Sequence, residues 1–217
     1  MDDIFPILAL ETSDELCSVA VLLSENSFSE INVKGKHIHS EKLIPMIEDI
    51  LKTNNLQVSQ IKSIAVSEGP GSFTGLRIGM AAVKGIVVST NIPVMPVPTF
   101  SAVAFKISTF MLNGQNFVIA KKASRDEVYF ARYLFSENKL KDVVPLCLIK
   151  ISEISSKVEK NDLVFSNIIH QSNSEDITPS ALDIGRWAYK FGKDLVTSNY
   201  DLLEPKYFKE FKVRSIA

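Results

Sequence analysis

The sequence is poor in the residues that build disulfide frameworks and metal sites. Its 217 residues include two cysteines and three histidines. Cys17 and Cys147 both sit inside apolar runs, which is typical of small buried side chains. His37 and His39 are two residues apart, a spacing that makes side chains diverge on a helix. We therefore predict no metal site for these histidines or for His170.

Neither sign of charge dominates, and long apolar runs are missing. Lys plus Arg number 24 and Asp plus Glu number 25. A protein that grips nucleic acid by itself usually carries a basic excess, so we expect any RNA contact to be shared with a partner. No apolar run approaches the ~18 residues of a membrane span. The acidic start, MDDIFPILALETS, is unlike a secretory signal, and we expect a cytoplasmic protein with no membrane partner.

Alternating apolar segments predict an α/β chain. Three short strands in a row indicate an antiparallel meander, and the following segments have helical and then strand-like spacing. Ser40 is the expected N-cap of the first helix, and Pro45 lies inside it. The predicted segments of this half are strands at 4–10, 17–23, 28–33 and 61–66 and helices at 40–53, 76–89 and 100–111.

The second half repeats this order more weakly. Strands are expected at 117–120, 127–135, 143–149 and 163–169, with helices at 152–160 and behind Thr178-Pro179. Three strands followed by helix, strand and helix is the order of one actin-like ATPase lobe. We predict a two-lobed actin-like ATPase (ASKHA, ribonuclease H-like) fold with a reduced second lobe. The expected lobes are residues 1–103 and residues 104–217, the latter including the tail.

The most unusual stretch is GPGSFTGLRIG, residues 69–79. It is not a Walker loop, because three residues separate Gly71 from Gly75 and no Lys-Ser/Thr pair follows. Two interpretations stay open. It is a tight turn leading into a helix capped by Ser72 or Thr74, or it is an anion site at that helix N-terminus.

The helix behind this turn is unusually small-sided. Gly75, Gly79, Ala82 and Gly85 fall within eleven residues. Each interior glycine costs up to ~1 kcal/mol relative to alanine, so their presence calls for a reason. Close packing inside the lobe and close approach of an external helix explain them equally well.

Several segments resemble, in order and spacing, the TsaB (YeaZ) family. They are LALETSDELCSVAVL, HSEKLIPMIEDIL, SEGPGSFTGLRIGMAAVKGI, PVPTFSAVA, DEVYFARY and the late PKYF. The resemblance covers about the first 135 residues well, and GPGSFTGLRIG is its most specific part. It implies the two-lobed actin-like fold and a non-catalytic scaffold subunit, not an enzyme on its own.

The resemblance also implies a set of partners. The chain would pair with and activate TsaD, the catalytic subunit that places threonylcarbamoyl on a tRNA adenosine beside the anticodon. TsaE, an ATPase, would join them, and tRNA would be contacted through the complex. ATP and a divalent metal would belong to the partner subunits, with no cofactor of the chain's own. Alone, the chain would form a homodimer through the same surface.

Two sets of site residues follow from the family pattern. The first two helices of the N-terminal lobe would bind the partner through Leu43, Ile47, Ile50, Gly75, Arg77, Gly79, Ala82, Val83 and Ile86. A nucleotide would contact the strand turn and the glycine-rich turn through Thr12, Ser13, Gly69, Gly71, Ser72 and Thr74. No residue is predicted to be catalytic.

The chain departs from the family at Glu11, where an Asp is usual, and at 122–124, where Lys-Ala-Ser replaces Asp-Ala-Arg. An independent actin-like ATPase needs a glycine in its phosphate turn, and Glu11-Thr12-Ser13-Asp14 has none. The alternatives are a stand-alone actin-like ATP-dependent kinase or transferase and, less favoured, a peptidase-like homologue. The basic tail (Lys206, Lys209, Lys212 and Arg214) is most simply a solvated face.

Overall fold

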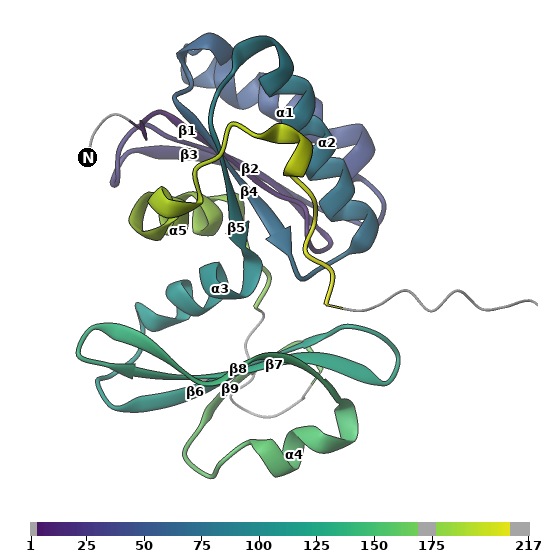
Figure 1. Ribbon diagram of the computed structural model, residues 1–217, viewed down its shortest axis with the longest axis vertical. Coiled ribbons are helices and arrows are strands. Elements are labelled where there is room, and N and C mark those ends of the chain that lie inside the picture. The colour runs from purple at the N-terminus through teal and green to yellow at the C-terminus, as the bar shows by residue number, and fades with distance from the viewer. Residues whose placement is uncertain (1–3, 169–176, 209–217) are drawn as a thin grey trace, which may run out of the picture. The chain divides into compact units, whose positions relative to one another are not determined.

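The computed structural model describes residues 4–168 and 177–208, which divide into two compact units (Figure 1). Unit 1 contains residues 4–111 and 177–205, and unit 2 contains residues 112–168 and 206–208. The chain therefore leaves unit 1, builds unit 2 and then returns to unit 1.

A five-stranded sheet in the order β3-β2-β1-β4-β5 forms the centre of unit 1. Its first three strands form an antiparallel meander, and β4 and β5 run parallel to β1. Every residue of β1 is buried because this central strand is covered on both faces. The strands are β1 (Ile7–Glu11), β2 (Leu16–Leu22), β3 (Phe28–Lys34), β4 (Ser63–Gly69) and β5 (Val94–Pro98).

Helices cover both faces of this sheet (Figure 1). On one face, α1 (His39–Thr53) and α2 (Phe73–Thr90) share an apolar core with β1, β2 and β4. On the other face, α3 (Thr99–Ser108) and α5 (Ala181–Phe191) lie together. The short 3-10 turns of unit 1 are η2 (Val58–Gln60), η4 (Gly192–Leu195) and η5 (Tyr200–Leu202).

The start of α1 differs from its predicted form. The expected N-cap, Ser40, lies inside the helix, which begins at His39 after Ile38 without a side-chain cap. The Ile38 carbonyl instead accepts hydrogen bonds from the backbone N–H groups of Glu41 and Lys42, at 3.0 and 2.8 Å. The backbone turn therefore starts this helix. Pro45 lies inside it, as expected.

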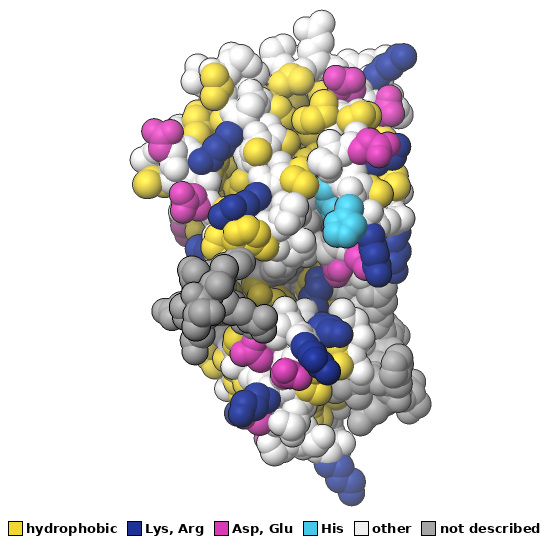
Figure 2. Space-filling model, turned by 90° about the vertical axis from the view of Figure 1, so that its right-hand side faces the viewer, with side chains coloured by type: hydrophobic (Ala, Val, Ile, Leu, Met, Phe, Trp, Pro, Cys, Tyr) yellow, Lys and Arg dark blue, Asp and Glu magenta, His cyan; other side chains and the backbone are white. Residues whose placement is uncertain are grey.

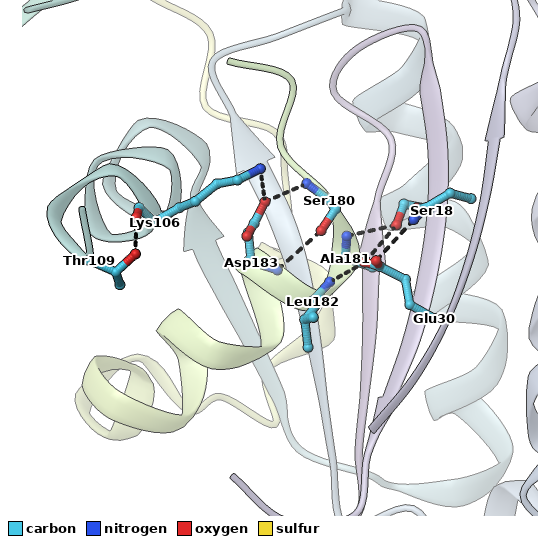
Figure 3. Close-up of polar contacts among 9 residues, drawn as sticks. Ser18, Glu30, Lys106, Thr109, Ser180, Ala181, Leu182 and Asp183 are labelled. Carbon is cyan, nitrogen blue, oxygen red and sulfur yellow. Dashed lines mark hydrogen bonds and ion pairs between the residues drawn. The ribbon is translucent and has the colours of Figure 1, made fainter. Parts of the chain in front are cut away.

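The N-terminus of α5 is fixed to the first meander (Figure 3). The backbone N–H of Ala181 donates to Ser18 Oγ at 2.8 Å, and that of Leu182 donates to Glu30 Oε1 at 2.8 Å. The first N–H groups of a helix have no partner within the helix. Side chains of β2 and β3 therefore supply these partners and hold α5 on the sheet of unit 1.

A capping box and an ion pair complete this contact (Figure 3). Ser180 and Asp183 bond reciprocally at the start of α5, as in a capping box. The Asp183 carboxylate also pairs with Lys106 Nζ of α3 at 3.0 Å. Two helices that lie far apart in the sequence are thereby joined on one face of the sheet.

The docking of α5 changes the predicted division of the chain. The sequence analysis assigned residues 104–217 to the second lobe, but α3 and α5 both pack in unit 1. Ala181, Ile184 and Ala188 lie in the unit 1 core, whereas Phe191 at the end of the helix is 49% exposed. Helical spacing identifies an apolar face but not which of two sheets that face covers.

Unit 2 is a smaller version of the same pattern. Its sheet has the order β8-β7-β6-β9, with an antiparallel meander followed by one parallel strand. This order repeats β3-β2-β1-β4 of unit 1, as expected for a reduced second lobe. Its elements are β6 (Gln115–Lys122), β7 (Glu127–Ser136), β8 (Lys139–Lys150), η3 (Ile151–Glu153), α4 (Ile154–Lys157) and β9 (Leu163–Ser166).

A buried cation lies in unit 2. The Arg132 side chain is only 8% exposed and donates to Asp162 Oδ1 from Nε at 3.1 Å and from Nη2 at 2.9 Å. Its Nη1 contacts Glu159 Oε1 at 2.5 Å. Several contacts raise the pKa of Arg132, and the hydrogen bond that Arg132 donates to Glu159 has the largest effect. The guanidinium therefore stays charged. Asp162 is equally enclosed, with 1% of its side chain exposed.

Helix α2 is exceptionally apolar. Among the described residues, it is the one helix whose length and composition would let it cross a membrane, with a mean hydropathy of 1.2. Its inner residues Met80, Val83 and Val87 lie in the unit 1 core, as in the core helix of a folded domain. The expectation that no apolar run approaches membrane-spanning length therefore has this one exception.

Helix α2 lies very close to the turn that follows β1. A Cβ added at Gly75 would overlap the carbonyl oxygen of Thr12, and one added at Gly79 would overlap the Thr12 side-chain oxygen. In contrast, a Cβ added at Gly85 would meet nothing within 4 Å. The first two glycines are therefore required for packing inside unit 1, and the third is not.

We predict that Arg132→Met destabilises unit 2 by about 3–5 kcal/mol, because it leaves Asp162 buried without its cation. Chemical denaturation followed by circular dichroism measures this loss. Glu159→Gln is the control and should cost about 1 kcal/mol or less, since that carboxylate is 68% exposed. A loss below about 1 kcal/mol for Arg132→Met would contradict the prediction.

We also predict that Gly75→Ala lowers the free energy of unfolding by about 1–3 kcal/mol, because its methyl group has no room against the Thr12 carbonyl. Gly85→Ala is the matched control on the same helix and should raise stability by up to ~1 kcal/mol. Thermal and urea unfolding of the two variants test the difference. Equal effects of the two substitutions would show that the close approach is not needed.

Candidate functional site

The structure brings together the residues predicted to bind nucleotide. β1 and β4 are parallel neighbours, so their carboxyl ends lie at the same edge of the sheet. Thr12 and Ser13 follow the end of β1. The glycine-rich turn, residues 69–75, begins at the end of β4. In open α/β sheets, such an edge is where ligands usually bind.

This edge is filled by the chain itself. Thr12 and Ser13 are 0% and 2% exposed. The Ser72 backbone N–H donates to the Ser13 carbonyl at 2.7 Å, and Gly71 lies directly against the Ser13 side chain. The N-terminal end of α2 is thus bonded onto the turn after β1.

Hydrogen bonds close the rest of the turn. Ser72 Oγ accepts from the Gly75 N–H at 3.2 Å, which caps α2. The Gly69 N–H donates to Thr99 Oγ1 at 3.1 Å. Thr74 and Ser72 are exposed, Gly71 is half-buried, and Gly69 is buried. Ser72 therefore caps α2, as the helix-capping interpretation of this turn predicts.

The six residues predicted to contact a nucleotide therefore differ in exposure. Thr12, Ser13 and Gly69 are buried, because glycines at 71 and 75 let the helix approach the strand turn. Two acidic side chains, Glu11 and Glu68, are buried at the same strand ends, at 0% and 3% exposure. The Glu11 carboxylate accepts a short hydrogen bond from the Ser13 N–H.

This environment also governs the nearby thiol. Burial, and secondarily the charge of Glu11, raises the pKa of Cys17 to about 11. Because the thiolate is the reactive form, Cys17 is inert near neutral pH. The sequence prediction of a small buried side chain is confirmed for Cys17, whereas Cys147 is only half-buried.

The predicted partner-binding residues fall into two groups. Six of the nine are buried within unit 1 and form its core or its close helix contacts. The apolar stripe of α1 faces the sheet because a surface helix turns its most apolar side inward. The six buried residues are Leu43, Ile47, Ile50, Gly75, Gly79 and Val83.

The other three residues lie nearer the surface. Arg77 is exposed and stacks its guanidinium over the Phe73 ring at 3.9 Å, whereas Ala82 and Ile86 are half-buried. Neighbouring apolar residues that the sequence analysis missed are more exposed. They form the outer face of the two helices, which we define as Ile44, Ala81, Gly85 and Val88.

This outer face is bare of other parts of the chain. Val88 is 78% exposed and Ile44 is 47% exposed. Only 33% of the 18-residue α2 window is buried, although its mean hydropathy is 1.2. On this side of unit 1, Figure 2 shows hydrophobic side chains gathered between acidic and basic ones. A large exposed apolar patch with a charged rim is typical of an interaction surface.

A signal for this face is present in the sequence. Ala81, Gly85 and Val88 recur at spacings of four and three, so α2 has a second apolar stripe behind its core stripe. A helix that is apolar all round is normally covered on all sides. The predicted partner site used Gly75, Gly79 and the α1 stripe instead, and these residues are buried in unit 1.

The histidines do not gather into a site. His37 is exposed, and His39 is 6% exposed at the start of α1. Within residues 4–168 and 177–208 no group of three or more His, Cys, Asp and Glu side chains could hold a metal ion. His170 lies outside these ranges, as do Lys209, Lys212 and Arg214 of the basic tail.

The departure at 122–124 forms a local turn. The N–H groups of Ala123 and Ser124 donate to the Glu127 carbonyl at 3.0 and 3.1 Å, and Ser124 Oγ donates to Glu127 Oε2 at 2.9 Å. Lys122 is exposed, and its backbone N–H donates to Asn167 Oδ1 at 3.2 Å. This stretch therefore serves to join β6 and β7.

Comparisons with known proteins agree with this architecture. The family described as "TsaD: tRNA N6-adenosine threonylcarbamoyltransferase" matches residues 31–191, well over half of the chain. A solved structure of YeaZ from Pseudomonas aeruginosa superposes with a TM-score of 0.75 at 24% identity, covering 93% of this chain and 98% of that one. The two-lobed actin-like fold with a reduced second lobe is thereby confirmed.

Two curated relatives have the same name, "tRNA threonylcarbamoyladenosine biosynthesis protein TsaB". The Haemophilus influenzae protein is 36% identical over 126 residues, which are 58% of this chain and 52% of that protein. This chain thus spans about half the length of that relative. The protein of Buchnera aphidicola from Schizaphis graminum is 32% identical over 161 residues, or 74% of this chain and 75% of that protein. Sequence and fold together show that this chain belongs to the TsaB (YeaZ) family.

Proposed function

We propose that this chain is a non-catalytic scaffold subunit of the machinery that forms N6-threonylcarbamoyladenosine in tRNA. In this role it pairs with the transferase subunit, TsaD, and activates it. The names of its relatives place those proteins in this biosynthesis. The structural feature that carries the proposal is the outer face of α1 and α2, an exposed apolar surface to which a partner helix would bind.

The size of the side chains on this face favours a helix as the binding element. Ala81 and Gly85 are exposed on α2, and a Cβ at Gly85 would touch nothing within 4 Å. Small residues let a second backbone come close, and ridges on the partner fill the groove that they leave. Ile44 and Val88 are larger exposed apolar side chains of the outer face that a partner helix would bury.

The identity of the partner follows from the relationship to the transferase family. That family matches residues 31–191, a range that includes both α1 and α2. A homologous subunit carries an equivalent pair of helices, and two such pairs can meet about an approximate two-fold axis. The same geometry gives a homodimer when the chain is alone. TsaE and tRNA then join through the assembled complex.

The filled edge of the sheet supports a non-catalytic role. The turn after β1 is bonded to the N-terminal end of α2 and buried, at the place where an actin-like ATPase holds phosphate. We propose that ATP and a divalent metal belong to the partner subunits, and that the complex works in the cytoplasm. A stand-alone kinase or a peptidase would need this edge, or another built site, to be open.

We predict that Gly85→Leu abolishes pairing with TsaD while the monomer stays folded. The added side chain points into open space in the free chain but occupies the groove that a partner helix needs. The dissociation constant should rise at least tenfold, measured by titration calorimetry with the purified subunits. Circular dichroism should show an unchanged fold.

Gly79→Leu provides the contrasting variant. It should unfold unit 1, because a side chain there overlaps Thr12. This distinguishes loss of pairing by misfolding from loss of pairing at the surface. If Gly85→Leu pairs as tightly as the wild type, the outer face of α2 is not the interface.

The purified chain should not turn over ATP by itself in the presence of tRNA and threonylcarbamoyl-adenylate. The reason is that its phosphate-turn position is occupied by backbone of α2. Release of phosphate is measured with and without the transferase subunit. Turnover by the chain alone near ordinary enzyme rates, about 1 s⁻¹ or more, would contradict the scaffold role.

A further inference from the structure

The segment after α5 crosses to the face of the sheet that carries α1 and α2. Thr197 and Val94 exchange backbone hydrogen bonds of 2.9 Å, which adds a short antiparallel bridge at β5. The Tyr200 hydroxyl then donates to the Ile92 carbonyl at 3.0 Å, just beyond the end of α2. Leu203 is 3% exposed and lies in the core that α1 and α2 share.

This crossing makes η5 a third element on the face. The sheet order places α1 over β2 and β3 and α2 over β4, and the bridge from Thr197 places the returning segment at β5. Tyr200 and Leu203 pack into the same core as Val87 of α2. Val88, the next residue of α2, is the most exposed large apolar residue of the outer face.

Adjacent leucines of the returning segment point to opposite sides. Leu203 is 3% exposed, whereas Leu202 is 77% exposed. Tyr200 and Leu203 hold this single helical turn on both sides of Leu202. The Leu202 side chain could point inward only if the Tyr200 hydrogen bond and the Leu203 core contact were lost. The Tyr200 bond to Ile92 places η5 just beyond the C-terminal end of α2, so Leu202 adds an exposed apolar side chain to this part of unit 1.

Acidic side chains flank this leucine, because Asp201 and Glu204 are both exposed. The exposed charges of α1 and α2 have both signs, with Glu48 and Asp49 alongside Lys52 and Arg77. The acidic pair beside Leu202 favours a basic group at the matching position of a partner, and such charges act mainly on specificity and association rate.

We propose that η5, with Leu202 at its centre, is a specificity-determining part of the partner surface, and that it contacts the transferase subunit. The proposal rests on the pairing proposed above and names a contact within it. The family match ends at residue 191, so η5 lies outside the stretch that the chain shares with the transferase family. The transferase subunit can therefore use η5 to distinguish this chain from a second transferase subunit.

The test uses the full chain and the transferase subunit from the same organism. Leu202→Glu should raise the dissociation constant of the pair at least tenfold, because it places a charge where an apolar contact is lost. Leu202→Ala should raise it about fivefold. Circular dichroism and thermal unfolding should match the wild type, since Leu202 makes no core contact.

Leu112→Glu is the matched control. Leu112 is 70% exposed and belongs to unit 2, not to the outer face of α1 and α2. This variant should bind the transferase within twofold of the wild type. A double variant, Val88→Ala with Leu202→Ala, should be less damaging than the product of the two single effects if both residues touch one partner site.

The outcomes separate this proposal from the pairing itself. If the wild type pairs, Gly85→Leu fails to pair and Leu202→Glu binds within twofold of the wild type, the η5 contact is wrong and the pairing stands. If the wild type does not pair with the transferase at all, both are overturned. If Leu202→Glu breaks only the homodimer seen by sedimentation, the contact serves a second copy and the proposed occupant is wrong.

Discussion

The closeness of α2 to the turn after β1 is the constraint on which the rest of unit 1 depends. It is possible only because the positions that face Thr12 have no side chain. The same contact seals the edge of the sheet, caps α2 through Ser72 and fixes the height of α2 above the sheet. One packing requirement thus buries the turn after β1 and positions a helix.

The side of α2 that packs against the sheet is fixed by this contact, and the opposite side is exposed to solvent. Its core residues, Met80, Val83 and Val87, stabilise unit 1, while Ala81 and Val88 on its other side are exposed. A helix that is apolar on both sides is costly in water unless something covers it. The near-zero net charge of the chain agrees with this division, because such a protein has little means of gripping RNA by itself.

Much of the fold could be predicted from the sequence, because strands and helices have different apolar periods. The meander, the α/β unit and the reduced second lobe all followed from this difference. The site was harder. Gly75 and Gly79 look the same in sequence as Gly85, and only three-dimensional contacts show which of them faces Thr12. The helix behind Pro179 was also predicted, but it was assigned to the second lobe and packs in unit 1. Its apolar face alone does not show which of two similar sheets it covers.

The return of α5 to unit 1 has a consequence for how the protein is made. Residues 112–168 of unit 2 are contiguous and can form their sheet as soon as they leave the ribosome. The face of the first sheet under Ala181, Ile184 and Ala188 has no cover until α5 has been synthesised. Unit 1, which begins the chain, is therefore the last to be completed. Until α5 has been synthesised, the uncovered apolar face of its sheet is the surface that chaperones would shield.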